Sequence, residues 1–347
     1  MKSRSTMRAV GLYRALPIDE PGALVDLIIP APEPNPLDLL VRVEAVSVNP
    51  ADCRVRLRKK NDGHYAILGW DVAGTVLDKG TGVGSQFEVG DKVYYAGTIE
   101  RPGANSELHV VDHRIVAHRP RNLSSNASAA VPLVALTAWE ALFDRMGFSM
   151  DCVGAARSLL IIGAAGGVGS MAVQFGRLIP GLCVIATASK PESQQWCSSL
   201  GAHHVIDHTT DLQEQLSALG RSSVNAVLLL SNPDMYFARL HELISPQGVI
   251  CSIVPFTRPH DFNPLMRKSV TFHWEYMFTR SSFQTEDLSK QSRILYQVAD
   301  LIEEGRIITP LFRELQPIQA ETLIEAHRLL ECGHSIGKIA VFGFPDT

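Results

Sequence analysis

Two rhythms of apolar and polar residues divide the chain. In the first part, the two kinds alternate through "LLVRVEAVSV" (39–48), "GDKVYYAG" (90–97) and "SELHVVDHRIVAHRP" (106–120). Alternation is typical of half-buried strands, and Gly, Pro and Asp turn signals separate these segments. The Pro-rich stretch "PAPEPNPLD" (30–38) indicates an exposed connector. This part is therefore predicted to be rich in β-structure.

From about Leu133 the rhythm changes to short continuous apolar runs separated by helical segments. The runs are "SLLIIGA", "CVIATAS", "HHVIDH", "NAVLLLS" and "VICSIV", and the helices between them include "GSMAVQFGRLI", "PESQQWCSSLGA" and "DLQEQLSALG". Such alternation indicates a parallel sheet covered on both faces. Two later helices and the strand "GKIAVFGF" do not continue the pattern. We therefore expect an α/β protein with domains at 1–132 and 133–280, and a return to the first domain over 281–347.

Composition excludes several classes of protein. The net charge is -4 over 347 residues, and no Lys/Arg run is long enough to suggest a nucleic-acid partner. The densest basic patch, "RVRLRKK" (54–60), fits a solvated face better than an anion site. Glycine-rich turns interrupt every candidate membrane span. The six cysteines include no CxxC pair and no signal peptide precedes them, which predicts reduced thiols in a soluble cytoplasmic protein.

The stretch "GAAGGVG" follows a predicted strand and opens a predicted helix. Glycine permits a tight turn, lets backbone N–H groups approach a pyrophosphate, and allows close packing of helix on sheet. The partial positive charge of the helix N-terminus favours the same anion. The turn is therefore predicted to bind a dinucleotide through Gly163, Ala165, Gly166, Gly167, Val168 and Gly169.

The end of the next strand predicts which dinucleotide. NAD sites usually place Asp or Glu there, roughly 20 residues beyond the glycines, to bind the ribose 2′-hydroxyl. Here the segment is "ATASKPES", with no carboxylate before Glu192. A hydroxyl at Ser189 and an ammonium at Lys190 would hold a 2′-phosphate, which a carboxylate would repel. The sequence therefore predicts NADPH, and a solvated helix-start lysine is the alternative.

Across nearly its full length the chain resembles the medium-chain dehydrogenase/reductase superfamily, in its zinc-lacking quinone oxidoreductase-like branch. The stretches that carry the resemblance are "SVNPADCRVR", "ILGWDVAGTV", "GDKVYYAG", "LTAWEALFDR", "GAAGGVGS", "ATASKPES", "LGAHHVIDH" and "FHWEYMFTR". The resemblance implies a GroES-like catalytic domain, an inserted Rossmann domain, a cleft between them, and a homodimer. It also implies cofactor contacts from Thr137, His208 and Val254.

The departures from the zinc alcohol dehydrogenases concern the metal ligands. Where the zinc enzymes carry a Cys and a His, this chain has Asn49 in "NPAD" and Trp70 in "GWD". The four cysteines of the structural zinc lobe are also missing. A catalytic zinc needs three protein ligands and an open position, and two of the expected three are lost. The histidines of "AHHVIDH" lie along a strand and its end, where neighbouring side chains face opposite ways, so they do not restore a metal site. We therefore predict no metal.

The missing metal narrows the chemistry. Reduction of a simple ketone places full charge on an alkoxide, which zinc stabilises. Hydride addition to an enone or quinone yields a less basic anion that neutral donors can support. We therefore expect an NADPH-dependent reductase of quinones or α,β-unsaturated carbonyls. Asn49 is the candidate hydrogen-bond donor towards the nicotinamide, the ribose or the substrate oxygen. Tyr65 is a candidate proton source, as is solvent, and Trp70 is expected to line the substrate pocket. A dedicated enoyl reductase and a non-catalytic, crystallin-like NADPH-binding protein stay open.

Overall fold

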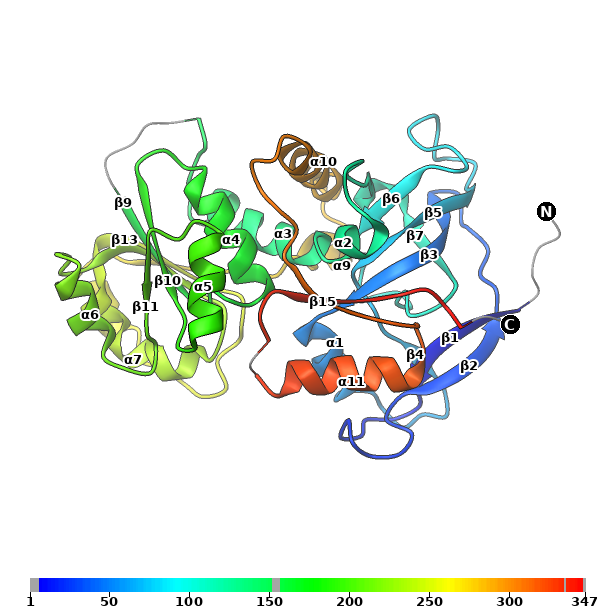
Figure 1. The fold of residues 1–347 in the computed structure, drawn as a ribbon, viewed down its shortest axis with the longest axis horizontal. Coiled ribbons are helices and arrows are strands. Elements are labelled where there is room, and N and C mark those ends of the chain that lie inside the picture. Colours follow the sequence, from blue (N-terminus) through cyan, green and yellow to red (C-terminus); the bar gives the residue numbers. More distant parts are fainter. Residues whose placement is uncertain (1–5, 152–156, 334, 346–347) are drawn as a thin grey trace. The chain divides into compact units, whose positions relative to one another are not determined.

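The computed structural model describes residues 6–151, 157–333 and 335–345. Cys152, one of the six predicted thiols, lies outside them. The chain forms two compact units. Unit 1 comprises Met1–Leu133 and Phe278–Thr347, and unit 2 comprises Val134–Met277 (Figure 1). The C-terminal segment therefore returns to the unit formed by the N-terminal segment.

Unit 1 contains two sheets. A three-stranded sheet has the order β2-β1-β4, and the larger sheet has the order β15-β16-β3-β5-β6-β8, with β7 also paired to β3. The strands are β1 (Thr6–Leu12), β2 (Val25–Pro30), β3 (Asp38–Val48), β4 (Ala66–Ile67), β5 (Val72–Lys79), β6 (Lys92–Tyr95), β7 (Leu108–Asp112), β8 (Ala117–His118), β15 (Leu311–Leu315) and β16 (Lys338–Phe342). β16, from the end of the chain, pairs antiparallel with β3, from near its beginning.

Short helices complete unit 1. They are α1 (Pro50–Arg56), the 3₁₀ turn η1 (His113–Ile115), α2 (Ser125–Ala129), α9 (Thr279–Phe283), α10 (Lys290–Glu303) and α11 (Ala320–Glu331). α3 (Pro132–Trp139) crosses the boundary between the units and continues as a π-helix, η2 (Glu140–Arg145). α10 and α11 each bury one apolar face, as their helical periodicity predicts.

Unit 2 is built on one parallel sheet of order β11-β10-β9-β12-β13-β14. Its strands are β9 (Arg157–Ile162), β10 (Leu182–Thr187), β11 (His204–Ile206), β12 (Val224–Leu229), β13 (Ile244–Ser252) and β14 (Thr271–Trp274). Its helices are α4 (Gly167–Arg177), α5 (Pro191–Ser199), α6 (Leu212–Ala218), α7 (Pro233–Leu243) and α8 (Asn263–Met266). The chain runs outward from β9 to β11 and then returns to β12, so the strand order reverses between β9 and β12. In such sheets ligands bind at the carboxyl ends of the strands beside this point.

The predicted fold class is confirmed, and nearly every predicted strand and helix is present. Two local predictions need correction. Arg56, in the basic patch, is fully buried rather than solvated. No glycine-rich turn interrupts residues Ser125–Arg145, which are long and apolar enough to cross a membrane, and 83% of the 18-residue apolar window within them is buried inside the protein.

Candidate functional site

The glycine turn of unit 2 connects β9 to α4 as predicted. Gly163 has a φ of +85°, a backbone conformation that favours glycine. Its N–H donates to the Thr187 hydroxyl at the end of β10, with an N–O distance of 3.1 Å. Gly166 is the N-cap residue of α4, and no side chain caps this end of the helix. The first N–H groups of α4 are therefore left for a ligand, and an anion suits them.

Two glycines of this turn serve different purposes. A Cβ added at Gly169 would lie 2.4 Å from the Ala164 carbonyl oxygen, so this glycine is required for packing of the turn on the helix. A Cβ added at Gly166 would meet only the Gly163 oxygen, at 3.7 Å. The fold itself has room for a side chain at Gly166. A glycine there keeps that room free, as close approach of a ligand to the backbone requires.

The segment after β10 places Ser189 and Lys190 before α5. Ser189 is half-buried, and Lys190 is exposed as the N-cap residue. The Lys190 backbone N–H donates to Ser193 Oγ at 3.2 Å, which fixes the start of the helix without using the ammonium group. Among the residues that the structure describes, no carboxylate forms an ion pair with Lys190. The ammonium is thus available to an anion.

The other predicted cofactor residues lie on three elements of unit 2. Thr137 is buried in α3, and Val254 follows β13. His208 follows β11, and its buried Nδ1 has no hydrogen-bond partner among the described residues. Val254 and His208 follow the carboxyl ends of their strands, the edge that the glycine turn also occupies. Their contacts with a cofactor stay a prediction.

Sequence reasoning missed the segment after β12. The Leu230 N–H donates to the Ile162 carbonyl oxygen at 3.0 Å, which brings this segment against the glycine turn. A Cβ on Gly163 would lie 2.9 Å from Ser231 Oγ. Asn232 follows with a φ of +41°. The feature that distinguishes this segment is the positive φ of Asn232, which is not a glycine. Short sequence patterns do not predict such a backbone angle, so no pattern in the sequence indicated this segment.

In unit 1, three chain segments meet at Asn49, and strand register brings them there. β16 pairs with β3 so that Ile339 lies opposite Val48, which places Lys338 beside Asn49. β5 pairs with β3 so that Val72 lies opposite Val46, which places Asp71 at the same end. Asn49 caps α1, and Pro50 occupies its first position.

Asn49 is buried, and its amide is fully used. Its Nδ2 donates to Asp71 Oδ2 at 3.0 Å and to the Ser47 carbonyl oxygen at 3.2 Å. Its Oδ1 accepts from Lys338 Nζ at 2.6 Å. Both amide hydrogens therefore have partners inside unit 1. Donation from Asn49 to a substrate or cofactor stays a prediction, and it requires one of these bonds to open.

Two buried carboxylates surround this amide. Asp71 Oδ2 lies 3.1 Å from Lys338 Nζ, and its Oδ1 accepts from the Leu133 N–H at 2.8 Å. Asp52 accepts from the Asn49 and Gly69 N–H groups, at 2.6 and 3.1 Å. Burial raises the pKa of Asp52 to about 7, although these hydrogen bonds and Lys338 oppose the shift. Asp52 thus orients the backbone at Asn49 and Gly69.

The two predicted substrate residues differ in exposure. Trp70 is 3% exposed; its Nε1 donates to the Thr98 carbonyl oxygen at 2.8 Å, and its ring meets Phe278 edge-on. Tyr65 is 42% exposed and packs edge-on against Tyr13, with ring centroids 6.4 Å apart. Trp70 therefore fills space within unit 1, and its place in a substrate pocket stays a prediction. Tyr65 has a phenol that solvent can reach.

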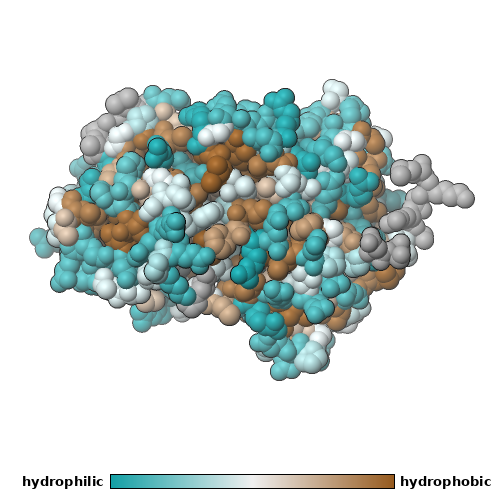
Figure 2. Space-filling model, in the orientation of Figure 1, coloured by the Kyte–Doolittle hydropathy of each residue, from teal (hydrophilic) through white to brown (hydrophobic). Residues whose placement is uncertain are grey.

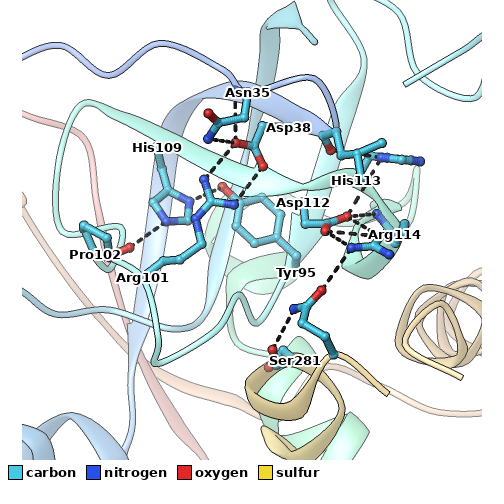
Figure 3. Close-up of polar contacts among 12 residues, drawn as sticks. Asn35, Asp38, Tyr95, Arg101, Pro102, His109, Asp112, His113, Arg114 and Ser281 are labelled. Carbon is cyan, nitrogen blue, oxygen red and sulfur yellow. Dashed lines mark hydrogen bonds and ion pairs between the residues drawn. The ribbon is translucent and has the colours of Figure 1, made fainter. Parts of the chain in front are cut away.

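The loop after β6, where a zinc lobe would be expected, is held by protein contacts (Figure 3). Arg101 donates to both oxygens of Asp38, at 2.7 and 2.9 Å. His109 lies 3.1 Å from the Pro102 carbonyl oxygen through Nε2 and 3.0 Å from the Tyr95 hydroxyl through Nδ1. Burial lowers the pKa of His109 to about 4, so the ring is neutral and Tyr95 donates to it. This loop also supports Trp70, whose Nε1 donates to the Thr98 carbonyl oxygen.

The groups around Asn49 do not fit a catalytic zinc. The amide of Asn49 and the indole of Trp70 stand where thiolate and imidazole ligands would be needed, and neither is a zinc ligand. The Lys338 ammonium already supplies the cation that Asp71 and Asn49 Oδ1 bind. A divalent ion there would have to displace or repel that ammonium. The prediction that the site lacks a metal rests on this chemistry.

The chain matches two family models. Residues 35–121 match the alcohol dehydrogenase GroES-like domain, and residues 200–341 match the zinc-binding dehydrogenase family. A zinc-type alcohol dehydrogenase-like protein of Staphylococcus epidermidis is 35% identical over 96% of this chain and 99% of its own length. The sequence likeness thus extends over both units.

Two solved structures share the complete fold. A candidate zinc-dependent alcohol dehydrogenase from Rhizobium etli CFN 42 is 45% identical, with a TM-score of 0.93, and the match covers 98% of this chain and 99% of that one. The quinone oxidoreductase of Coxiella burnetii is 25% identical, with a TM-score of 0.80, over 98% and 100% of the two chains.

Proposed function

Because the chain belongs to the medium-chain dehydrogenase/reductase superfamily, in its quinone oxidoreductase-like branch, it is an oxidoreductase of nicotinamide type, and we propose that it reduces quinones or α,β-unsaturated carbonyls with NADPH and without zinc. The observation that carries this proposal is the set of groups around Asn49. An amide and an indole take the places that metal ligands would need, and the Lys338 ammonium already supplies the cation that Asp71 and Asn49 Oδ1 bind.

The cofactor supplies the hydride, and unit 2 is proposed to hold it. The first N–H groups of α4 would bind the pyrophosphate, Gly166 would let it approach, and Ser189 and Lys190 would bind the 2′-phosphate. A hydride added to the β-carbon of an enone leaves an enolate, or a quinol anion in the case of a quinone. Neutral donors can support these anions because their charge is delocalised. Protonation from solvent or from the exposed Tyr65 hydroxyl completes the reduction.

The test is consumption of NADPH by the purified, chelator-treated protein. We expect absorbance loss with 1,2-naphthoquinone or an enal, slower loss with NADH, and no oxidation of ethanol. Bound NADPH without turnover over a broad panel of acceptors would favour the non-catalytic alternative. Turnover only with long acyl-linked enones would favour the dedicated enoyl reductase. Ethanol oxidation that the chelator abolishes and Zn²⁺ restores would contradict the proposal.

We also propose that the protein is cytoplasmic, as its cysteine usage predicts, and that it forms a homodimer, as the family resemblance implies. β14 is the last strand of the unit 2 sheet among the described residues, so one of its edges is open to pairing. Trp274 and Tyr276, at this edge, are each 49% exposed. Apolar side chains also reach the surface elsewhere (Figure 2). Light scattering coupled to gel filtration tests the assembly, and a monomeric mass would contradict it.

A further inference from the structure

Cys53, His327 and Glu331 bring three metal-binding groups together in unit 1, one helical turn beyond Asn49. Cys53 lies on α1, while His327 and Glu331 lie four residues apart on one face of α11. The two helices pack side by side (Figure 1). One ligand atom from each residue can be chosen so that all three lie within 4.8 Å of one another.

We propose that these three residues bind one Zn²⁺ ion, at a site separate from the catalytic groups around Asn49. The proposal does not rest on the proposed reductase activity. Zinc takes a thiolate, an imidazole nitrogen and a carboxylate oxygen in tetrahedral sites. With a Zn–S bond of 2.3 Å and a Zn–N bond near 2.0 Å, a tetrahedral angle separates the two ligand atoms by about 3.5 Å. Cys53 Sγ and His327 Nδ1 form a hydrogen bond in the structure and lie 3.5 Å apart, so an ion could replace the shared proton without moving the two atoms apart.

The surroundings of the three residues suit this role. His327 is fully buried and Cys53 is 7% exposed, so both ligand groups are shielded from solvent. Binding of a metal ion would release the thiol proton of Cys53, because the thiolate is the ligand form of cysteine. The side chain of Glu331 is 31% exposed, which gives an ion and a fourth, water ligand a path from solvent.

Arg56 determines which oxygen of Glu331 a metal ion would bind. Its buried guanidinium donates to Glu331 Oε1 through Nη2 and to the Leu16 carbonyl oxygen through Nη1. Arg56 Nη2 contacts Oε1, so the proposal assigns the other carboxylate oxygen, Oε2, to the ion. Carboxylate ligands are commonly held by such outer hydrogen bonds, which orient them. Arg56 also opposes a divalent cation by charge, so thiolate and carboxylate charges are both needed to offset it. We therefore expect the affinity to depend on all three ligands.

Titration of the chelator-treated, reduced full-length protein with Co²⁺ tests the site. We expect one equivalent to give a thiolate-to-cobalt charge-transfer band and the visible bands of a tetrahedral ion, both abolished by Zn²⁺. Cys53→Ser removes the charge-transfer band. Glu331→Gln weakens binding at least about tenfold, as expected for loss of a ligand or its support. The matched control is Cys332→Ser, which removes the exposed cysteine next to Glu331 and should leave the spectrum unchanged.

Three results would overturn the site. They are absence of a charge-transfer band in the wild-type protein, persistence of the band in Cys53→Ser, and its loss in Cys332→Ser. Circular dichroism checks that each variant is folded. If Cys53→Ser does not fold, His327→Gln takes its place and must weaken Co²⁺ binding at least about tenfold. Since the readout is spectroscopic, failure of this site leaves the proposed reductase activity untouched, and the reverse also holds.

Discussion

The glycine turn of unit 2 leaves backbone N–H groups and space open, whereas the cluster of Asn49, Asp71 and Lys338 in unit 1 (the Asn49 cluster) is closed by its own hydrogen bonds. At the turn, Gly166 leaves room that the fold does not need, and the first N–H groups of α4 have no side-chain cap. At Asn49, each hydrogen-bonding atom of the amide has a partner, and a lysine ammonium occupies the position of a cation. The open backbone N–H groups suit an anionic cofactor, whereas the polar cluster already contains a cation, the Lys338 ammonium. Variants of each region should therefore fail differently.

Lys338→Met should produce the largest loss of stability. Its removal leaves Asp71 buried without the cation that lies 3.1 Å away. Breaking a buried ion pair by removing one partner costs about 3 to 5 kcal/mol in free energy of unfolding. Urea denaturation measures it. A loss below about 1 kcal/mol, as for a surface pair, would show that the Lys338 ammonium does not form a buried ion pair with Asp71.

Gly169→Ala and Gly166→Ala form a matched pair in the turn. The first places a methyl group 2.4 Å from the Ala164 oxygen and should lower the free energy of unfolding by about 1 to 3 kcal/mol. The second meets only the Gly163 oxygen, so it should leave stability nearly unchanged and weaken NADPH binding. Denaturation and fluorescence titration separate the two effects. Equal NADPH affinity in Gly166→Ala and wild type would contradict a ligand at that glycine.

Acid should destabilise the loop after β6 through His109. Its folded pKa is about 4, below the ordinary value of 6.5, so the unfolded state binds more protons between these values. The stabilisation is present above pH 6.5 and is lost as the pH falls towards 4. Linkage gives a loss of about 2 kcal/mol between pH 7 and 5 from this residue. His109→Gln should remove that part of the pH dependence in urea unfolding. An unchanged slope would show that His109 is not buried as a neutral ring.

Lys190→Ala should have the smallest effect, confined to one cofactor. Loss of a charged hydrogen bond to a 2′-phosphate should weaken NADPH binding about tenfold, equivalent to about 1.4 kcal/mol. NADH carries no such phosphate, so its affinity should not change. Titration with both cofactors measures the ratio, and a parallel loss for both would remove Lys190 from the specificity site. Glu192→Gln is a nearby control that should leave the ratio unchanged.

The turn was predictable from sequence because its signals are local. Strand, glycines and helix lie within one short stretch, and the missing carboxylate follows one strand later. The Asn49 cluster was only half predictable. "NPAD" and "GWD" indicate lost metal ligands, but Lys338 lies 289 residues from Asn49 and reaches it through the pairing of β16 with β3.

Contacts between distant parts of the chain also explain the features that the sequence did not predict correctly or did not predict at all. Arg56 looks solvated within "RVRLRKK", yet it is buried because Glu331, 275 residues away, accepts from it. His327 and Cys53 are 274 residues apart, so no spacing motif connects them. Ser231 reaches the glycine turn only because β12 pairs with β9. Residues with distant partners need strand register, which short sequence patterns do not provide.

The central claim, reduction without a catalytic metal, is tested most directly by NADPH consumption with 1,2-naphthoquinone after exhaustive chelation, followed by addition of Zn²⁺. Cys53→Ser is assayed in parallel, so that an ion bound at the α1–α11 cluster is not mistaken for a catalytic one. We expect equal rates before and after chelation, in wild type and variant alike, with no gain on adding Zn²⁺. A rate that chelation abolishes and Zn²⁺ restores in both proteins would contradict it.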